Sequence, residues 1–260
     1  MLIPFIKMHA QGNDFVILDG FASVLPELPF PILAKQMCRI HTGIGADGLV
    51  LLSPCDNAAA KMTIYNSDGS LAEMCGSALR CVSFLTHQRT QLSEFIVNTD
   101  SGLKPVSVCA KSGDVTVNLG TPMLMLSNYN AEGLSGDLVD IGNLHFVVWQ
   151  SDLSGNPHLQ HGSALEHHAG FPRPVNAHFA KVLSPSEIDI KIWERACGAT
   201  LACGTGAASV VFSGISKGML SSPVKVNMPG GSVYISEESG AYLLSGQVRQ
   251  VFCGEYQWKA

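Results

Sequence analysis

The sequence predicts an α+β fold made of two similar lobes, and three observations lead to that prediction. Short strand-like segments alternate with turns along the whole chain. Two apolar runs suited to helices occur, one in each half. A segment of the first half, residues 64–80, is echoed by residues 192–208 of the second half. A chain of 260 residues is long enough for two lobes of ordinary size.

The internal repeat extends beyond one segment. Cys75 pairs with Cys203 and Asn66 with Glu194, each at a separation of 128 positions, and the segment 12–17 is echoed by 142–148 at a separation of 130. We therefore interpret the chain as a duplication. We place the N-terminal lobe, which carries Cys75, at residues 1–120 and the C-terminal lobe, which carries Cys203, at 121–247. We expect the tail 248–260 to return to the first lobe.

In the first lobe we expect a strand at 5–8, a polar turn at 9–13 and a second strand at 15–18. A proline-rich loop at 26–31 leads into a short helix at 32–38. Strands follow at 49–52 and 62–65, the second delivering Asn66 to a turn rich in Asn, Asp, Ser and Gly. The helix after Cys75 places Ala78, Val82 and Leu85 on one face, as expected of a packed central helix. The lobe closes with strands at 95–97, 106–108 and 115–117.

The second lobe repeats this order. We expect strands within 138–150, a loose region at 151–174 and a strand at 177–183. The loose region holds four of the nine histidines without regular metal-ligand spacing, which favours a solvated loop or a short surface helix. A strand ending at Trp193 leads to Cys203, and the helix after it is apolar almost all round, with Gly218 as its expected C-terminal cap. Strands at 224–228, 232–235 and 242–245 complete the lobe.

Composition limits the possible partners. The net charge is −5, no block of basic residues is present and hydrophobic residues make up 46% of the chain, so we expect neither nucleic acid nor a membrane as a partner. No signal-peptide pattern and no apolar run of the roughly 18 residues needed for a membrane helix occurs, which predicts a cytoplasmic protein. The eight scattered cysteines do not form the framework of a small secreted protein. A small polar molecule remains the expected substrate.

Two cysteines at helix starts suggest proton chemistry at carbon. Unpaired backbone N–H groups and the positive end of the helix dipole stabilise a thiolate at such a position. One thiolate can remove a proton next to a carboxylate while a second thiol delivers a proton to the opposite face. Backbone N–H groups of Gly76-Ser77 and Gly204-Thr205 could hold the carboxylate and stabilise its developing charge. This scheme needs no cofactor.

A series of motifs lies in order over nearly the whole chain. They are Lys7-Met8-His9 with Gly12-Asn13-Asp14-Phe15, the glycine-rich 43–48, Asn66 with Asp68-Gly69, Cys75-Gly76, Gly142-Asn143 with His145, Asn176, Glu194-Arg195, the segment 202–206 and Pro229-Gly230-Gly231. Each motif alone is moderately specific, but together and in order they are strong. In these motifs the chain resembles the cofactor-independent diaminopimelate epimerases.

The resemblance implies a role for each matching position. Cys75 and Cys203 would be the acid and base in the epimerisation of LL-2,6-diaminopimelate to the meso isomer, a step of lysine and peptidoglycan precursor synthesis, without pyridoxal phosphate or metal. His145 and Glu194 would adjust the cysteine pKa values. Each lobe would be a curled, mostly antiparallel sheet around a central helix, with the active site in the cleft between the lobes, and the protein would be a homodimer. The substrate-binding residues would be Asn13, Asn66, Gly76, Ser77, Asn143, Asn176, Glu194, Arg195, Gly204 and Thr205.

Some positions depart from the usual family pattern. Ser77-Ala78-Leu79 stands where many members have Asn-Gly-Ala, Leu144 replaces a proline, Ala196-Cys197-Gly198-Ala199 replaces Gly-Ala-Gly-Glu, and Phe252 aligns with a tyrosine associated with dimer contacts. Backbone N–H donors survive a change of side chain, so the reaction type is preserved. The shape of the site next to Cys75 and before Cys203 is where a difference in substrate would arise.

Two other functions fit the residues. One is a different cofactor-independent amino-acid racemase on the same fold, although the four asparagines and Glu194-Arg195 favour a substrate with a distal amino-acid head. The other is a non-catalytic thiol redox or binding protein in which Cys75 and Cys203 form a disulfide, although the C-x-x-C motif of redox proteins is absent. A zinc site from Cys75, Cys81, Cys197 and Cys203 is disfavoured because both pairs have the wide spacing C-x5-C.

Overall fold

The computed structural model describes residues 1–25, 27–72 and 74–258. It divides into two compact units, of which the first comprises residues 1–117 with 247–260 and the second residues 118–246. Position 26 of the expected loop 26–31 and positions 259–260 of the expected tail lie outside the described residues. Within the described part of the chain, no helix is long and apolar enough to cross a membrane.

The first unit is a curved, mostly antiparallel sheet. Strand β18 lies against β1, which pairs with β2, and the order continues through β3, β4, β6, β7 and β8; the pairs β2–β3 and β4–β6 are parallel and the others antiparallel. Short β5 adds to β4. The strands are β1 Leu2–Ala10, β2 Asn13–Asp19, β3 Gly48–Ser53, β4 Ala60–Asn66, β5 Leu71–Ala72, β6 Glu94–Thr99, β7 Gly102–Val108, β8 Val115–Asn118 and β18 Arg249–Gln257.

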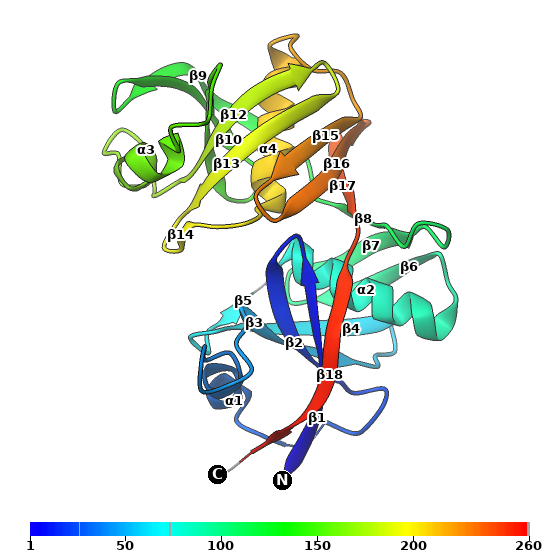
Figure 1. Cartoon of the computed structure of the whole chain (residues 1–260). Helices are drawn as coiled ribbons and strands as arrows, with labels where there is room; N and C mark the ends of the chain where they lie inside the picture. The colour runs from blue at the N-terminus through cyan, green and yellow to red at the C-terminus, as the bar shows by residue number, and fades with distance from the viewer. Residues whose placement is uncertain (26, 73, 259–260) are drawn as a thin grey trace. The chain divides into compact units, whose positions relative to one another are not determined.

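Helix α2 (Gly76–Thr90) forms the centre of the first unit. Helix α1 (Phe30–Met37) packs against β3 and β4. Helix α2 contacts β1 and β2 towards one end of the sheet and β7 towards the other, so the sheet curls around it. Figure 1 shows this helix behind the strands, with β18 alongside β1. The predicted inward face is buried, since Ala78 and Val82 are fully inaccessible and Leu85 is 6% exposed.

The second unit repeats this architecture. Its sheet runs β9, β10, β11, β12, β13, β15, β16, β17, with β11–β12 and β13–β15 parallel and the other pairs antiparallel, and β14 adds to β13. The strands are β9 Met123–Ala131, β10 Leu134–Asp140, β11 Leu144–Trp149, β12 Asn176–Ser184, β13 Glu187–Glu194, β14 Gly198–Ala199, β15 Val224–Met228, β16 Gly231–Glu238 and β17 Ala241–Gly246.

Helix α4 (Gly204–Ser216) is the buried helix of the second unit. It contacts β10, β11 and β12 and also β16 and β17, so the sheet wraps around it as in the first unit. A helix that is apolar on most sides has to be buried on most sides, and its alanines and valines are inaccessible. Gly218, which follows the capping residue Lys217, has a positive φ of 71° that favours glycine at a helix end.

The succession of parallel and antiparallel pairs is the same in the two units. Strand β18, from the end of the chain, takes the place next to β1 that β9 takes next to β10. The parallel pairs in both units are those bridged by a helix. The predicted α+β fold with two similar, largely antiparallel lobes is therefore confirmed, and the duplication read from the sequence is visible in the strand order.

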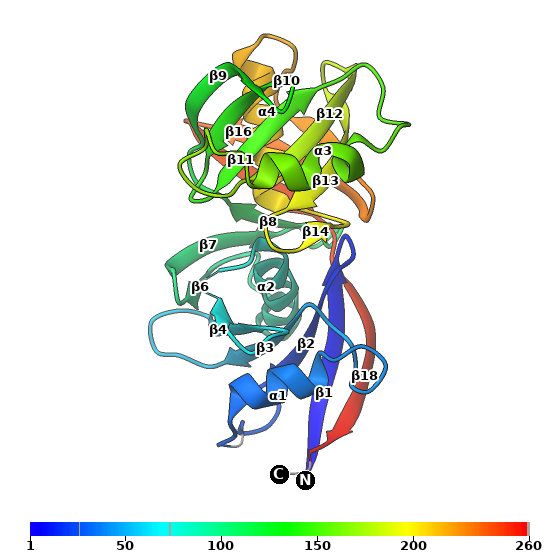
Figure 2. The same cartoon turned by 90° about the vertical axis from the view of Figure 1, so that its left-hand side faces the viewer.

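Several elements differ from expectation. Strand β9 was not predicted, because most of its side chains are exposed and it lacks an alternating pattern. The region 151–174 contains α3 (Pro157–Glu166), which is the short-helix alternative, but it is packed rather than free at the surface. Figure 2 shows α3 across β12 and β13. Gly162 of this helix is packed so closely that an added Cβ would lie 2.4 Å from the Trp193 ring of β13.

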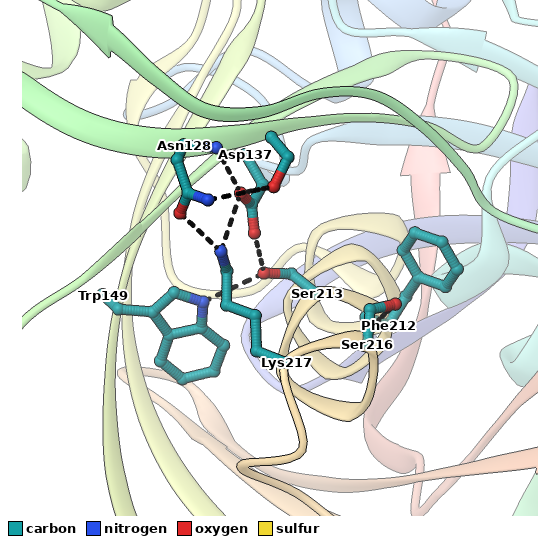
Figure 3. A network of polar contacts seen from close by, with 8 residues as sticks. Asn128, Asp137, Trp149, Phe212, Ser213, Ser216 and Lys217 are labelled. Carbon is teal, nitrogen blue, oxygen red and sulfur yellow. Dashed lines mark hydrogen bonds and ion pairs between the residues drawn. The ribbon is translucent and has the colours of Figure 1, made fainter.

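A buried polar network ties α4 to β9, β10 and β11 in the second unit (Figure 3). Asp137, which is 2% exposed, accepts hydrogen bonds from the Ser213 hydroxyl at 2.6 Å and the Asn128 backbone N–H at 2.9 Å, and lies 3.1 Å from the Lys217 ammonium. Ser213 in turn accepts from the Trp149 indole N–H at 2.9 Å. The network gives the carboxylate the partners that a buried charge requires.

Candidate functional site

Cys75 and Cys203 occupy the same place in their respective units. Each is the N-cap of the central helix, with extended backbone (φ −143° and −140°), and no side chain caps either helix. The first residues of both helices have backbone N–H groups without an intrahelical acceptor. These N–H groups belong to Gly76-Ser77 beside one cysteine and Gly204-Thr205 beside the other. Each unit therefore presents a thiol next to a set of N–H donors suited to an anion.

Asn13 orients its amide towards Cys75. The amide nitrogen of Asn13 donates to Asp47 Oδ2 at 2.7 Å, which leaves its oxygen facing the Cys75 sulfur at 3.6 Å. Asp47 also accepts the Asp14 backbone N–H at 3.0 Å, so the end of the glycine-rich segment 43–48 is fastened to the start of β2. The glycine-rich segment 43–48 thus supports the position of Asn13.

Arg80 is a buried cation close to Cys75. Its side chain is 2% exposed and donates from Nη1 to Gln11 Oε1 at 2.7 Å, and among the described residues its Nε has no hydrogen-bond partner. Burial lowers the pKa of Arg80 to about 10, while negative charge on Cys81 or Cys75 opposes that shift. Because burial raises the pKa of Cys81 to about 12, Cys81 stays neutral. Arg80 therefore places a buried positive charge in the electrostatic surroundings of Cys75.

The remaining N-terminal candidates lie near the end of β4 and the start of α2. Asn66 is exposed, and its amide nitrogen donates to the Ser70 hydroxyl at 2.9 Å within the turn held by Asp68. Gly76 is half-buried and Ser77 is 9% exposed. Asn66 therefore offers an amide from a tight turn, while Ser77 contributes its backbone at the helix start.

Cys203 has surroundings of the opposite electrostatic sign. It is 5% exposed, and burial, together with the neighbouring Glu194 carboxylate, raises its pKa well above the usual value, although a backbone hydrogen bond from Gly206 and the Thr205 hydroxyl at 3.7 Å act against this shift. Glu194 also accepts a 2.5 Å hydrogen bond from the Thr200 hydroxyl, which fixes the carboxylate. Cys203 is consequently held as a neutral thiol.

Asn143, His145 and His178 form a chain of side chains in the second unit. His145 Nε2 lies 2.9 Å from Asn143 Oδ1 and its Nδ1 lies 2.8 Å from His178 Nε2. Both rings are fully buried; burial lowers the pKa of His178 to about 3 and, with charge on His178 and Arg195, lowers that of His145 well below its usual value. With both rings neutral, both hydrogen bonds form if His178 donates to His145 and His145 donates to Asn143. Among the described residues the amide N–H groups of Asn143 have no acceptor, so they remain available to a ligand.

The side chain of Asn176 binds the backbone of Arg195. The Asn176 amide donates to the Leu144 carbonyl at 3.0 Å and accepts the Arg195 backbone N–H at 3.1 Å. Arg195 is exposed, and among the described residues its guanidinium has no ion-pair partner. Asn176 thus fixes the backbone at Arg195, whose guanidinium follows directly after Glu194 in the chain.

The structure groups the predicted residues by unit. Asn13, Asn66, Gly76 and Ser77 belong with Cys75, and Asn143, His145, Asn176, Glu194, Arg195, Gly204 and Thr205 belong with Cys203. Sequence reasoning missed Gln11, Arg80, His178 and Thr200. Arg80 had a weak signal, since it is a charged residue within an apolar helix; His178, inside a predicted strand, had none.

One group of the described residues has the composition of a metal site. Single ligand atoms of His145, His178 and Cys203 all lie within 4.8 Å of one another, and all three residues are buried. This set differs from the four cysteines considered from the sequence, of which Cys81 is fully buried and Cys197 exposed.

Gly206 is required by the packing of His178. A Cβ added at Gly206 would lie 2.1 Å from Cε1 and 2.5 Å from Nε2 of the His178 ring. Gly206→Ala should therefore displace the ring from His145 and destabilise the fold by about 1–3 kcal/mol, the usual cost of overpacking. Urea unfolding measures this change. Gly155→Ala is the control for loss of a glycine in the same unit, because an added Cβ there would meet only Gln160 Nε2 at 3.9 Å and the backbone has no positive φ. Equal stability of Gly206→Ala and the unmodified protein would contradict the packing argument.

Comparison with known proteins identifies relatives over the whole chain. The family model described as diaminopimelate epimerase matches residues 5–125 and 138–249. The chain is 37% identical to a diaminopimelate epimerase of Pelotomaculum thermopropionicum, with 98% of this chain and 99% of the relative covered. It is 39% identical to a diaminopimelate epimerase of Carboxydothermus hydrogenoformans, over the same shares of the two chains.

Solved structures with low sequence identity share the fold. A PhzF-family phenazine biosynthesis protein of Bacillus anthracis has a TM-score of 0.74 at 13% identity, with 99% of this chain and all of that chain covered. A probable proline racemase of Agrobacterium radiobacter, crystallised with carbonate, has a TM-score of 0.70 at 15% identity, with coverage of 99% and 93%. These likenesses concern the architecture alone.

Proposed function

The chain belongs to the diaminopimelate epimerase family, and on this premise we propose that it converts LL-2,6-diaminopimelate to meso-diaminopimelate without a cofactor. In this proposal Cys75 and Cys203 act on opposite faces of one α-carbon. The reaction would supply the meso isomer for lysine and peptidoglycan precursor synthesis, and we place it in the cytoplasm.

The contrast between the two thiols is the observation that carries the proposal. Both cap a central helix, but Cys75 has a buried cation, Arg80, in its electrostatic surroundings, whereas Cys203 is buried beside the Glu194 carboxylate. A two-base reaction needs one thiolate and one thiol at the same time. We assign the thiolate to Cys75 and the thiol to Cys203 in the protein that is ready to react with the LL isomer.

The proposed reaction then follows in two proton transfers. The Cys75 thiolate takes the α-proton, and the electron pair of the C–H bond delocalises into the carboxylate, whose developing charge the helix N–H groups stabilise. The Cys203 thiol delivers its proton to the opposite face, which inverts the carbon and leaves Cys203 as thiolate. The roles are exchanged in the reverse direction. A structural preference for neutral Cys203 favours return of that proton from solvent before the next turnover.

The second amino-acid head of the substrate fits the polar residues of the C-terminal unit. Arg195 supplies a fork for the distal carboxylate and Glu194 a partner for the distal ammonium. The free N–H groups of Asn143 suit a carboxylate oxygen, and Asn13, Asn66 and Asn176 complete the proposed binding set. A substrate without a distal head would leave these groups unpaired, which would give selectivity.

Arg80 should control the reactivity of Cys75. Arg80→Met keeps an apolar stem in the buried space but removes the charge, so the pH at which Cys75 reacts with iodoacetamide should move upward and kcat/KM at neutral pH should fall by at least about tenfold. Peptide mass spectrometry of the alkylated protein reports the site. Arg80→Lys, which keeps the charge, should recover most of the loss. An unchanged alkylation profile in folded Arg80→Met would reject this role.

The substrate assignment is tested by chiral chromatography of product mixtures. Reduced protein is incubated with LL-diaminopimelate, and in parallel with L-proline, L-lysine and L-glutamate. Interconversion confined to diaminopimelate, approaching a mixture in which the meso isomer is present, is the expected result. Inversion of a different amino acid in preference to diaminopimelate would instead establish the racemase alternative.

We also propose a homodimer that uses β18. Among the described strands β18 pairs only with β1, and its residues Val251 and Phe252 are 55% and 46% exposed. Phe252 packs edge-on against Phe5 at 5.8 Å, which would hold its ring in place for a partner. Exposed apolar side chains on an edge strand suit association between copies.

A further inference from the structure

We propose that the group His145, His178 and Cys203 binds a thiophilic divalent cation of the zinc class. This capture would occur at the same sulfur that the proposed epimerisation uses, so the cation would act as a reversible inhibitor. Binding of the cation stands apart from the proposed function; only the inhibition rests on it.

The geometry of the three side chains suits a shared ligand. Their ligand atoms lie within 4.8 Å of one another, and the two rings already approach to 2.8 Å between Nδ1 of His145 and Nε2 of His178. A metal bound by one sulfur and two imidazole nitrogens sits about 2.3 Å from sulfur and about 2.0 Å from nitrogen. Small side-chain shifts are therefore enough to bring all three atoms into bonding distance.

The surroundings provide the support that metal-binding histidines usually have. His145 Nε2 is held by the side-chain carbonyl of Asn143 at 2.9 Å, which orients the ring and leaves Nδ1 as its ligand atom. The His178 ring packs directly against Gly206, where an added Cβ would clash with it. Nδ1 of His178 is buried and, among the described residues, has no hydrogen-bond partner, so this ring has an unused polar atom inside the group.

The ligand set selects the kind of cation. Two imidazoles and a thiolate suit zinc and related borderline or soft metals, whereas magnesium and calcium require oxygen ligands. Both histidines are buried as neutral rings, which is the form that binds metal, and each can offer one lone pair while keeping one proton. Binding through His145 Nδ1 and His178 Nε2 moves the Nε2 proton of His178 to Nδ1 of the same ring, which has no hydrogen-bond partner among the described residues, and breaks the Cys203 S–H bond. The sulfur electron pair forms the metal–sulfur bond, and one proton is released per cation.

Binding is measured on the reduced full chain with Co²⁺ and Zn²⁺ as probes, in a phosphine-reduced and oxygen-free buffer. We expect one Co²⁺ per chain with a thiolate-to-cobalt charge-transfer absorption, displacement of Co²⁺ by Zn²⁺, and release of one proton per cation. Zn²⁺ should also abolish diaminopimelate epimerisation, and a chelator should restore it.

Two variants and a background control decide whether this site is responsible. His178→Gln should weaken binding by at least about 100-fold, because loss of a ligand costs no less than loss of a supporting residue. Cys203→Ser should remove the charge-transfer band. The triple variant Cys109→Ser, Cys197→Ser, Cys253→Ser, which lacks the exposed thiols, should bind as before.

Circular dichroism checks that each variant is folded. If His178→Gln does not fold, the band in Cys203→Ser alone decides. Absence of binding, unchanged affinity in folded His178→Gln, persistence of the band in Cys203→Ser, or loss of binding in the triple variant would each overturn the proposal. Since these readouts use no substrate, they do not depend on whether the chain epimerises diaminopimelate.

Discussion

Cys203→Ser and Cys75→Ser should each lower kcat for diaminopimelate epimerisation by about 10² to 10⁴-fold, the range that a positioned acid or base contributes. A serine hydroxyl is a much weaker acid than a thiol and does not supply an anion near neutral pH. Because the two sulfurs have to act in the same turnover, the double variant should be hardly worse than either single variant. Steady-state rates by chiral chromatography measure these effects.

Cys109→Ser is the matched control for these variants. Cys109 is an exposed cysteine and belongs to none of the proposed catalytic or binding residues. Its activity should stay within about twofold of the unmodified protein. A rate loss in Cys109→Ser comparable with that in Cys203→Ser, or near-normal turnover by either Cys75→Ser or Cys203→Ser, would contradict the assignment of the two thiols.

Asp137→Ala should destabilise the protein by about 3–5 kcal/mol, because it removes the anion from a buried group of donors and leaves the Lys217 charge without its partner. The carboxylate is 2% exposed and is the point at which α4, β9 and β10 are joined (Figure 3). Urea unfolding of the purified protein measures the difference. Lys217→Met, at a side chain that is 26% exposed, should cost less.

The contribution of Asp137 should depend on pH in a defined direction. Burial alone would raise its pKa, but hydrogen bonds from Ser213 and Asn128 and the contact with Lys217 outweigh burial and lower it. A carboxyl with a depressed folded-state pKa stabilises the fold above its unfolded value of about 3.9, and this stabilisation is lost as pH falls through the folded value. The stability difference between the protein and Asp137→Asn should therefore be constant near neutrality and shrink below about pH 4. A difference that grew on acidification would contradict this sign.

The two helix starts and most of the strands could be predicted because each depends on a short stretch of sequence. The repeated cysteine and glycine motifs at a separation of 128 positions identify the two helix starts. Around them, short strand-like segments alternate clearly with turns. Strand β9 could not be predicted, since its side chains are mostly exposed on a sheet whose position depends on pairing with β10. Its part in the duplication became clear only from the equivalent place of β18 next to β1.

The supporting residues of the site depend on contacts between distant positions. Arg80 donates to Gln11, which is 69 residues away, and His145 meets His178 across 33 residues. Neither pair has a fixed sequence spacing, so nothing in the sequence alone separates these residues from ordinary helix and strand positions. The functional asymmetry that we propose for the two thiols rests on such contacts, whereas their equivalent positions in the two units follow from the duplication.

The most direct test of the two-thiol account is proton NMR of LL-diaminopimelate in D₂O with the reduced protein, alongside Cys75→Ala and Cys203→Ala. We expect deuterium at one α-position together with formation of the meso isomer, and loss of epimerisation in both variants. Absence of α-exchange with folded, reduced protein, or formation of deuterated meso isomer by either variant at the normal rate, would contradict the account.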